Sequence, residues 1–319
     1  MVTSSTADDI EGARVRRVHG RTVGKPDSVD VREGYEVRVG KGGGGVERTR
    51  KRMPVSPIHQ SVMSWLKDAG VRRRWGEARR ILREALAGED SRTFVNVYIY
   101  NAALNVAARC SEWEAALNLM SYMRKQGINP DVVSYNSAIK ACGDDKQWEQ
   151  ALRLLSEMRR EGVTPDVVSY TSAIKACGDG KQWERALTLL SEMRRQGVTP
   201  DVVSYTSAMK ACGDGGQWEQ ALSLLSEMRR QGINPNVVSY NSAMKACGDG
   251  GQWERALTLL SEMRRQGVTP NVVSYNSAMK VCGDGRQWEQ ALSLLSEMRR
   301  EGVTPDVVSY NSAVKACGD

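Results

Sequence analysis

Apolar residues recur at helical spacing along most of the chain. After Asp166, the residues Tyr170, Ile174 and Cys177 follow one another at i, i+4 and i+7, which predicts an amphipathic helix. Asp166 is a candidate N-cap for this helix, and Gly178 is a candidate end. We therefore expect a first helix that buries one face.

A second apolar stripe follows directly and predicts a second helix. Its members are Trp183, Ala186, Leu187, Leu190 and Met193. Asp179 and Gln182 have the spacing of a capping box before the stripe, Arg194 suits the last turn, and Gly197 suits the position after it. Two short helices cannot bury both stripes alone, so we expect hairpins that fold by stacking on their neighbours.

The hairpin pattern repeats every 35 residues. Two aromatic columns mark the period: Tyr100, Tyr135, Tyr170, Tyr205, Tyr240, Tyr275 and Tyr310, and Trp113, Trp148, Trp183, Trp218, Trp253 and Trp288. Six complete units begin at residues 97, 132, 167, 202, 237 and 272, and a seventh begins at 307 and lacks a second helix. A period of this length is typical of stacked two-helix repeats. The incomplete unit leaves either an uncapped helix or a fragment of a longer protein, and it favours the fragment.

Most cysteines follow the same interval. They are Cys142, Cys177, Cys212, Cys247, Cys282 and Cys317. A constant interval indicates a structural column rather than a disulfide framework. Neighbouring repeats lie about a helix diameter apart, beyond the ~7 Å between Cα atoms that a disulfide spans, so we expect reduced, buried thiols.

Two segments precede the repeats. Residues 1–57 lack hydrophobic periodicity and contain four successive glycines at 42–45, which predicts a disordered tail. Clustered arginines make a targeting tail the alternative, but Asp8, Asp9 and Glu11 are wrong for a transit peptide. Residues 58–90 carry apolar residues at helical spacing and predict a degenerate helical pair.

Composition narrows the chemistry. The net charge of +7, from 45 basic and 38 acidic residues, permits an anionic partner without requiring one. No apolar run approaches the roughly 20 residues of a membrane span, so we expect no membrane partner. His19 and His59 lie outside the repeats and no Cys-x-x-Cys pair occurs, so we expect neither a catalytic centre in the array nor a metal or other cofactor.

The repeat resembles the pentatricopeptide repeat family across residues 97–319. The matching features are Val-Val-Ser-Tyr-Asn in the first helix, Cys-Gly at its end, Trp-Glu-x-Ala-Leu and Glu-Met in the second helix, and Gly-Val-Thr-Pro-Asp between units. Tetratricopeptide repeats instead carry Trp, Leu-Gly and Tyr in the first helix. The resemblance implies an all-α fold, a right-handed α-solenoid of stacked helix-turn-helix hairpins.

The resemblance also implies a function, because members of that family bind single-stranded RNA in a groove lined by the first helices, about one nucleotide per repeat. The fifth and last residues of each unit select the base, since an unpaired base offers its Watson–Crick edge to short polar side chains. These base-reading pairs are Asn101 with Asp131, Asn136 with Asp166, Thr171 with Asp201, Thr206 with Asn236, Asn241 with Asn271, and Asn276 with Asp306. The family's pairing rules then predict a site near 5′-UUGACU-3′. The first unit is the least regular, with Val95 in place of Pro and Asn105 in place of Lys.

Two further columns fit the groove that the resemblance implies. The base-sandwiching position holds Tyr98, Val133, Val168, Val203, Val238 and Val273. The lysine column, four residues after the base-reading position and on the same helical face, is expected to contact phosphate: Lys140, Lys175, Lys210, Lys245, Lys280 and Lys315. The alternatives are that the lysines form a solvated face and that the unit-end Asp and Asn act as N-caps, a role they can hold in addition. The tryptophans continue an apolar stripe and are expected in the core rather than against bases.

We therefore expect a monomeric, sequence-selective single-stranded RNA-binding protein with no enzyme activity of its own. The resemblance implies a role in a mitochondrion or plastid, in RNA processing, stability or translation, with RNA-processing proteins as further partners. Two alternatives stay open. One is a helical-repeat scaffold that binds a peptide, and the other is the N-terminal RNA-binding fragment of a longer RNA-processing enzyme.

Overall fold

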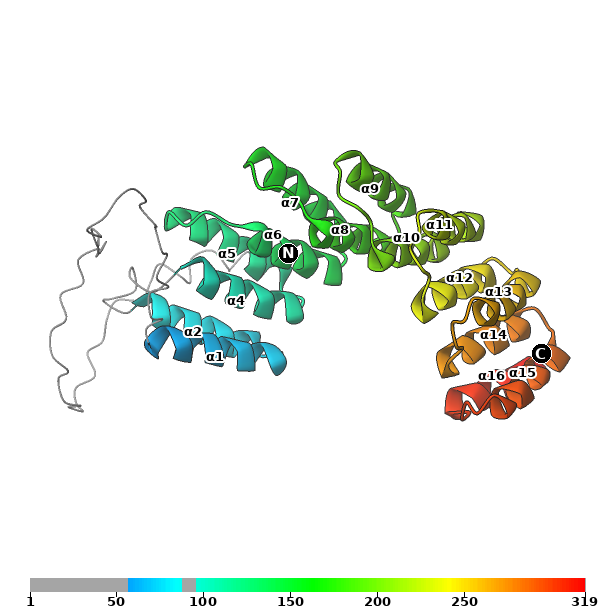
Figure 1. The fold of residues 1–319 in the computed structure, drawn as a ribbon. Coiled ribbons are helices and arrows are strands. Elements are labelled where there is room, and N and C mark those ends of the chain that lie inside the picture. The colour runs from blue at the N-terminus through cyan, green and yellow to red at the C-terminus, as the bar shows by residue number, and fades with distance from the viewer. Residues whose placement is uncertain (1–56, 88–95, 319) are drawn as a thin grey trace, which may run out of the picture. The chain divides into compact units, whose positions relative to one another are not determined.

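The computed structural model describes residues 57–87 and 96–318, and all regular structure in these ranges is helical (Figure 1). The all-α prediction is thereby confirmed. The predicted tail at 1–57 lies outside the described residues except for Pro57. No helix in the described ranges has both the length and the apolar character needed to cross a lipid bilayer.

The helices follow one another in pairs along the chain. Two helices, α1 (Pro57–Val71) and α2 (Trp75–Ala87), lie in the segment predicted as a degenerate pair. The six repeats contribute α4 (Val97–Arg109) with α5 (Trp113–Lys125), α6 (Val132–Asp144) with α7 (Trp148–Arg160), α8 (Val167–Asp179) with α9 (Trp183–Arg195), α10 (Val202–Asp214) with α11 (Trp218–Arg230), α12 (Val237–Asp249) with α13 (Trp253–Arg265), and α14 (Val272–Asp284) with α15 (Trp288–Arg300). A further first helix, α16 (Val307–Gly318), follows them.

The first helix of a repeat starts at a reciprocal cap. At α8, the backbone N–H of Ser169 donates to Asp166 Oδ1 at 2.9 Å, and the backbone N–H of Asp166 donates to Ser169 Oγ at 3.1 Å. This capping box satisfies two backbone donors that a helix start leaves free. The prediction of Asp166 as N-cap is therefore confirmed. The helix runs one residue past Gly178, to Asp179.

The second helix starts differently from the prediction. A capping box from Asp179 and Gln182 was expected, but Asp179 is the last residue of α8 and Gln182 occupies the N-cap without a side-chain cap bond. The cause is the short turn, because the extra residue of α8 leaves too little chain for a box. The end of α9 is as predicted. Gly197 has φ of 75°, and its N–H donates to Arg194 O at 3.0 Å.

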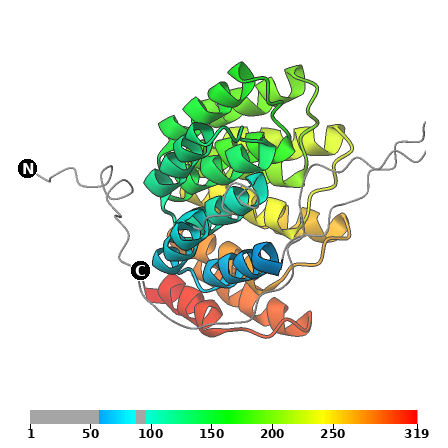
Figure 2. The ribbon, with the colours of Figure 1, turned by 90° about the vertical axis from the view of Figure 1, so that its left-hand side faces the viewer.

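Stacking is closest along the row of first helices. Neighbouring first helices such as α8 and α10 pack on one another, and each second helix packs on its own first helix and on the next one. Neighbouring second helices make no comparable contact in the described ranges, so the first-helix row is the tight side of the stack. Figure 2 shows successive hairpins lying one on another. Glycine permits the approach, because a Cβ on Gly213 would lie only 3.0 Å from that of Ala246.

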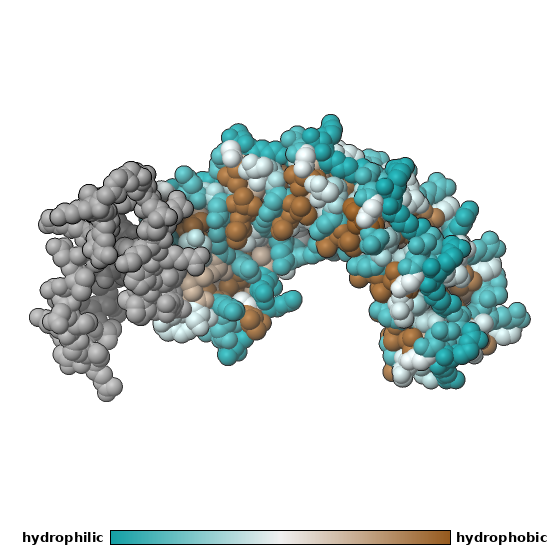
Figure 3. Space-filling model, in the orientation of Figure 1, coloured by the Kyte–Doolittle hydropathy of each residue, from teal (hydrophilic) through white to brown (hydrophobic). Residues whose placement is uncertain are grey.

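The stacked hairpins share one continuous core. Tyrosine, alanine and cysteine from the first helices meet alanine, leucine and methionine from the second helices. The tryptophans from Trp113 to Trp253 are half-buried and pack against this core, as expected. Trp288 was expected there too, but its side chain is 48% exposed. On the face shown in Figure 3, hydrophobic side chains form separate strips divided by hydrophilic ones. The exposed surface of that face is therefore not one broad apolar patch.

The cysteine column is mostly interior, as predicted. Five thiols are buried, and burial raises the pKa of Cys177 to about 11, so that thiol stays protonated at neutral pH. Burial of Cys317 was also expected, and that expectation is wrong because the side chain is exposed. It lies on α16, which is covered by α14 and α15 alone in the described ranges.

A network of polar contacts also joins the repeats on the side of the second helices. The Arg194 guanidinium lies 5.4 Å from the centre of the Tyr205 ring, donates to the Tyr205 hydroxyl at 2.8 Å and pairs with Glu227 at 2.5 Å. Arg159 makes the same contacts one repeat earlier, with Tyr170 and Glu192. These arginines were predicted only as last-turn residues, and they also hold successive hairpins together.

Candidate nucleic-acid interface

The two predicted base-reading columns lie on the two repeats that form each junction. The fifth residue lies on one first helix, and the last residue is the N-cap of the next. Where the pair is Asn and Asp, the two side chains bond directly. The Asn136 amide donates to Asp166 Oδ1 at 3.1 Å, and the Asn276 amide donates to Asp306 Oδ1 at 3.1 Å. The Asn101 amide likewise donates to Asp131 at 3.0 Å, although Asn101 itself is buried.

A buried serine links the two members of the pair. Ser169 Oγ lies 2.6 Å from Asn136 Oδ1 and 2.9 Å from Asp166 Oδ1, and it also accepts the backbone N–H of Asp166. The serine column is Ser134, Ser169, Ser204, Ser239, Ser274 and Ser309, and every member is fully buried. Sequence reasoning missed it, although Ser is the third residue of each unit from the second onward. A polar residue held constant on the buried side of a helix was the available signal.

Hydrogen bonds favour the ionised form of two of the paired carboxyl groups. Burial raises the pKa of Asp166, but hydrogen bonds from the Ser169 backbone, the Asn136 amide and the Ser169 hydroxyl outweigh it and lower that pKa below its ordinary value. At Asp306, the backbone N–H of Ser309 is the main cause of a lowered pKa. These side chains therefore act as hydrogen-bond acceptors at neutral pH.

The threonine junctions are arranged differently. Thr171 Oγ1 lies 2.8 Å from Ser204 Oγ, which in turn lies 2.8 Å from Asp201 Oδ1. The serine thus bridges the pair, and no direct bond joins Thr171 to Asp201 in the described ranges. At the next junction, Thr206 donates to the carbonyl of Val202 at 2.7 Å and also lies 3.1 Å from Ser239 Oγ.

The junction of two asparagines is the exception. Ser274 Oγ donates to Asn271 Oδ1 at 3.0 Å and has no recorded bond to Asn241. Asn241 Oδ1 is buried and lacks a hydrogen-bond partner. A buried acceptor without a partner costs about 1–3 kcal/mol, so this amide is held less firmly than those of the Asn–Asp junctions.

The predicted base-sandwiching column lies on the surface beside these pairs. Val203 and Val238 are each 58% exposed, and Tyr98 in the first unit is 65% exposed. A hollow of about 320 Å³ is lined by Val203, Thr206, Asn236, Val238, Lys175 and Lys210, with neighbouring residues. One junction therefore brings together a predicted base-reading pair, two exposed apolar side chains and two lysines.

The lysine column is exposed, and most of it is paired with acidic residues. Each paired lysine meets the aspartate that ends the first helix of the preceding repeat: Lys175 with Asp144 at 2.5 Å, Lys210 with Asp179 at 2.9 Å, Lys245 with Asp214 at 2.6 Å, and Lys315 with Asp284 at 3.3 Å. Sequence reasoning did not single out this aspartate column. The Asp after each Cys-Gly was its signal.

Lys140 and Lys280 make no ion pair in the described ranges. For Lys140, the position of the missing aspartate is held by Arg109 in the first unit. For Lys280, the corresponding Asp249 lies 3.0 Å from Lys245 instead. These two ammonium groups are the members of the column free to meet another anion.

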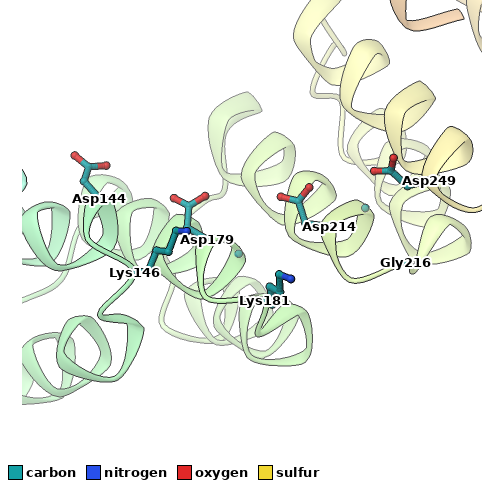
Figure 4. Close-up of a pocket in the computed structure, with 9 residues that line it drawn as sticks. Asp144, Lys146, Asp179, Lys181, Asp214, Gly216 and Asp249 are labelled. Atoms are coloured by element: carbon teal, nitrogen blue, oxygen red, sulfur yellow. The ribbon is translucent and has the colours of Figure 1, made fainter. Parts of the chain in front are cut away.

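The aspartates form a row along one edge of the first helices. Figure 4 shows the carboxyl groups of Asp144, Asp179, Asp214 and Asp249 at the ends of successive helices. They line a hollow of about 480 Å³ together with Lys146 and Lys181. No group of three metal-binding side chains occurs in the described part of the chain. Asp144, Asp179 and Asp214 of this row each pair with a lysine of the next repeat.

Sequence models of one family cover the repeats without a gap. The model described as the pentatricopeptide repeat domain matches residues 188–250 and 223–285. The PPR repeat family matches 95–144, 130–179 and 270–319, and the PPR repeat matches 168–198. Together they span residues 95–319.

Solved structures show the same fold. The pentatricopeptide repeat protein PPR10 from maize has a TM-score of 0.62 and 28% identity over 79% of this chain and 36% of its own. PPR10 in complex with an 18-nucleotide psaJ RNA element has a TM-score of 0.51 and 20% identity, over 82% of this chain and 43% of its own. The nuclear proteinaceous RNase P 2 from A. thaliana has a TM-score of 0.50 and 15% identity, over 59% and 42%. This chain therefore spans less than half the length of each. No curated protein matches it significantly.

Proposed function

Because the chain belongs to the pentatricopeptide repeat family, whose models cover residues 95–319, we propose that it binds single-stranded RNA sequence-selectively at the junctions between its repeats. The arrangement around Thr206 and Asn236 carries the proposal. Two short polar side chains with different hydrogen-bonding groups lie there between two exposed valines and beside two lysines. This combination suits an unstacked nucleotide, which offers a polar edge, an apolar face and a phosphate.

The proposed register is one nucleotide per junction. The six pairs, from Asn101 with Asp131 to Asn276 with Asp306, recognise U, U, G, A, C and U in order, which gives a preferred site near 5′-UUGACU-3′. Support comes from the position of each pair, since both members come from adjacent repeats and are separated from the next pair by one repeat. The exposed Val and Tyr column separates successive bases, and its role is steric.

Affinity comes in part from the lysine column. An ammonium group that contacts a phosphate releases cations that were bound to the RNA, so the affinity for RNA falls as the salt concentration rises. Lys140 and Lys280 contribute most, because the other four lysines of the column already pair with aspartates. The modest net charge of +7 agrees with binding that depends on several weak contacts rather than on a broad basic surface.

The biological role that fits is occupancy of an RNA site rather than chemistry on it. Bound to a transcript in a mitochondrion or plastid, a monomer of this kind would block nucleases, expose a neighbouring segment or recruit a processing protein. The complex of PPR10 with an 18-nucleotide RNA supports RNA as the ligand of this type of array.

A competition assay tests the proposal. The full chain is titrated against fluorescent RNAs that carry UUGACU or a scrambled hexamer of the same composition in identical flanks. We expect the UUGACU RNA to bind about tenfold or more tightly, the factor of two lost base contacts of ordinary strength. Equal affinity for both RNAs, or no binding to either, would contradict sequence-selective recognition and favour a peptide-binding scaffold.

A further inference from the structure

The buried serine controls which hydrogen-bonding groups each pair has left for a ligand. A hydroxyl donates one hydrogen and can accept two, whereas a carboxylate only accepts. The serine also accepts a hydrogen bond from the backbone N–H of the capping residue. At the junctions capped by Asp166, Asp201 and Asp306 this bond measures 3.1–3.4 Å. The single serine hydrogen is therefore the variable, and its partner differs between junctions.

At an Asn–Asp junction the serine orients an amide. Ser169 Oγ is closer to Asn136 Oδ1, at 2.6 Å, than to Asp166 Oδ1, at 2.9 Å. With its oxygen held by Ser169, Asn136 directs one N–H to Asp166 and keeps the second N–H available. The pair then presents a donor next to a carboxylate acceptor. Uracil complements that combination, because its edge carries one N–H between two carbonyl oxygens.

At the Thr–Asp junction the serine orients a hydroxyl. Ser204 Oγ lies 2.8 Å from both Thr171 Oγ1 and Asp201 Oδ1. Since Asp201 can only accept, the serine hydrogen goes to Asp201 and the Thr171 hydrogen goes to Ser204. Both members of the pair are left as acceptors. Guanine complements them, because its edge carries an N–H and an amino group side by side.

At the Thr–Asn junction the equivalent serine, Ser239, leaves a different pair of hydrogen-bonding groups. Asn236 Oδ1 accepts from the backbone N–H of Ser239 at 3.0 Å and lies 3.1 Å from Ser239 Oγ. The Asn236 amino group therefore remains as a donor, and Thr206, which donates to Val202, keeps an acceptor. Adenine complements a donor beside an acceptor.

We propose that the buried serine column is a set of positioning residues that determine base specificity, by fixing the direction of the hydrogen bonds within each pair. This inference rests on the proposed function. The serine does not touch RNA. It acts through the fifth and last residues, and it also caps the helix, so its two roles have to be separated experimentally.

The chain contains its own control for the capping role. Ser274 makes the same cap contacts as Ser204, accepting the Asn271 N–H at 3.2 Å and donating to Asn271 Oδ1 at 3.0 Å. It has no recorded bond to the fifth residue, Asn241. Ser204 is, in contrast, the recorded hydrogen-bond partner of Thr171. Replacement of either serine by alanine removes the contacts to the capping residue, but only Ser204→Ala also removes a hydrogen bond to the fifth residue of the pair.

The experiment measures base preference in these two variants. Wild type, Ser204→Ala and Ser274→Ala are titrated with RNAs that vary the third or the fifth nucleotide of UUGACU. We expect the preference for G over A at the third nucleotide to fall about fivefold in Ser204→Ala, the factor of one ordinary hydrogen bond. Ser274→Ala should change the preference for C at the fifth nucleotide by less than about twofold, because it removes contacts to the capping residue Asn271 and none to the fifth residue Asn241, and the backbone N–H of Ser274 still holds the Asn271 oxygen. Ser204→Thr, which keeps the hydroxyl, should restore the preference for G.

Each other result overturns the inference in a distinct way. If wild type shows no preference for G at the third nucleotide, the proposed function fails and the inference fails with it. If wild type prefers G and Ser204→Ala keeps the same ratio, only the inference fails. If Ser204→Ala also loses its preference for A at the fourth nucleotide, or Ser274→Ala loses as much as Ser204→Ala, the serine acts through general stability and not through positioning. A folded Ser204→Thr protein that lacks the preference for G would contradict the role of the hydroxyl.

Discussion

The two edges of each repeat junction are built in opposite ways. On the second-helix side, an arginine, a tyrosine and a glutamate recur, as Arg194 with Tyr205 and Glu227. On the first-helix side, a constant serine is surrounded by two residues that change, the fifth residue between Asn and Thr and the last between Asp and Asn. Both edges use polar side chains, but one set is the same at successive junctions and the other is not.

This difference separates the contacts that stack the hairpins from the pairs that we propose recognise RNA. The constant network lies on the side where neighbouring second helices pack less closely than the first helices do, and there ion pairs such as Arg194 with Glu227 join successive hairpins. The variable pairs lie where the first helices already pack closely, so a change of Asn to Thr need not alter the stack. An array built in this way can change its ligand without changing its fold.

Removal of Arg194 tests the stacking edge and should have the largest effect. The side chains of Arg194 and Glu227 are 32% and 20% exposed, between a surface pair and a buried one. We expect Arg194→Ala to lower the free energy of unfolding by about 2 kcal/mol, because it leaves a half-buried carboxylate and the Tyr205 hydroxyl without a partner. Urea unfolding followed by circular dichroism measures this.

The neighbouring arginine provides the matched control. Arg195 lies in the same last turn and is exposed, so Arg195→Ala should change the free energy of unfolding by no more than about 0.5 kcal/mol. The base preference of Arg194→Ala should equal that of wild type under conditions where both are folded. A stable Arg194→Ala protein with an altered base preference would contradict the comparison, because the second-helix side would then act in recognition and not in stacking.

The lysine column should give a smaller effect that appears only in salt dependence. Lys280 is exposed and makes no ion pair in the described ranges, so it is available to phosphate. Lys280→Ala should reduce the slope of log affinity against log salt by about 0.7, the value for one contact to a single strand. Lys181→Ala, in the turn beside the aspartate row, should leave the slope unchanged. Equal slopes for wild type and Lys280→Ala would remove Lys280 from the interface.

Much of the fold followed from spacing alone. The 35-residue period and the apolar stripes predicted the hairpins, and Asp166 and Gly197 marked two helix boundaries correctly. The capping box at Gln182 was wrong, because spacing alone does not show that the first helix extends to Asp179. Exposure of Cys317 was also missed, since burial depends on which neighbours cover a helix.

The site was only partly accessible from sequence. The pair columns were identified through family resemblance, and their contact with each other became visible only when one repeat was placed on the next. The Ser204 bridge, the pairing of Lys210 with Asp179 and the Arg194 network all join residues about 11 to 33 positions apart. Each member has an ordinary local explanation, as a cap, a solvated charge or a last-turn cation. Only the stacked geometry shows that they act together.

The most direct test of the account is the substitution Asn236→Asp. Asn and Asp are about equally good N-caps, so the helix and the stack should be preserved. The Thr206 junction would then carry the same pair as the Thr171 junction, with acceptors in place of a donor and an acceptor. Binding measured with the four RNAs that vary the fourth nucleotide of UUGACU should show the preference moving from A to G, by about 1 kcal/mol. An unchanged preference for A in the folded variant would contradict base recognition by these pairs.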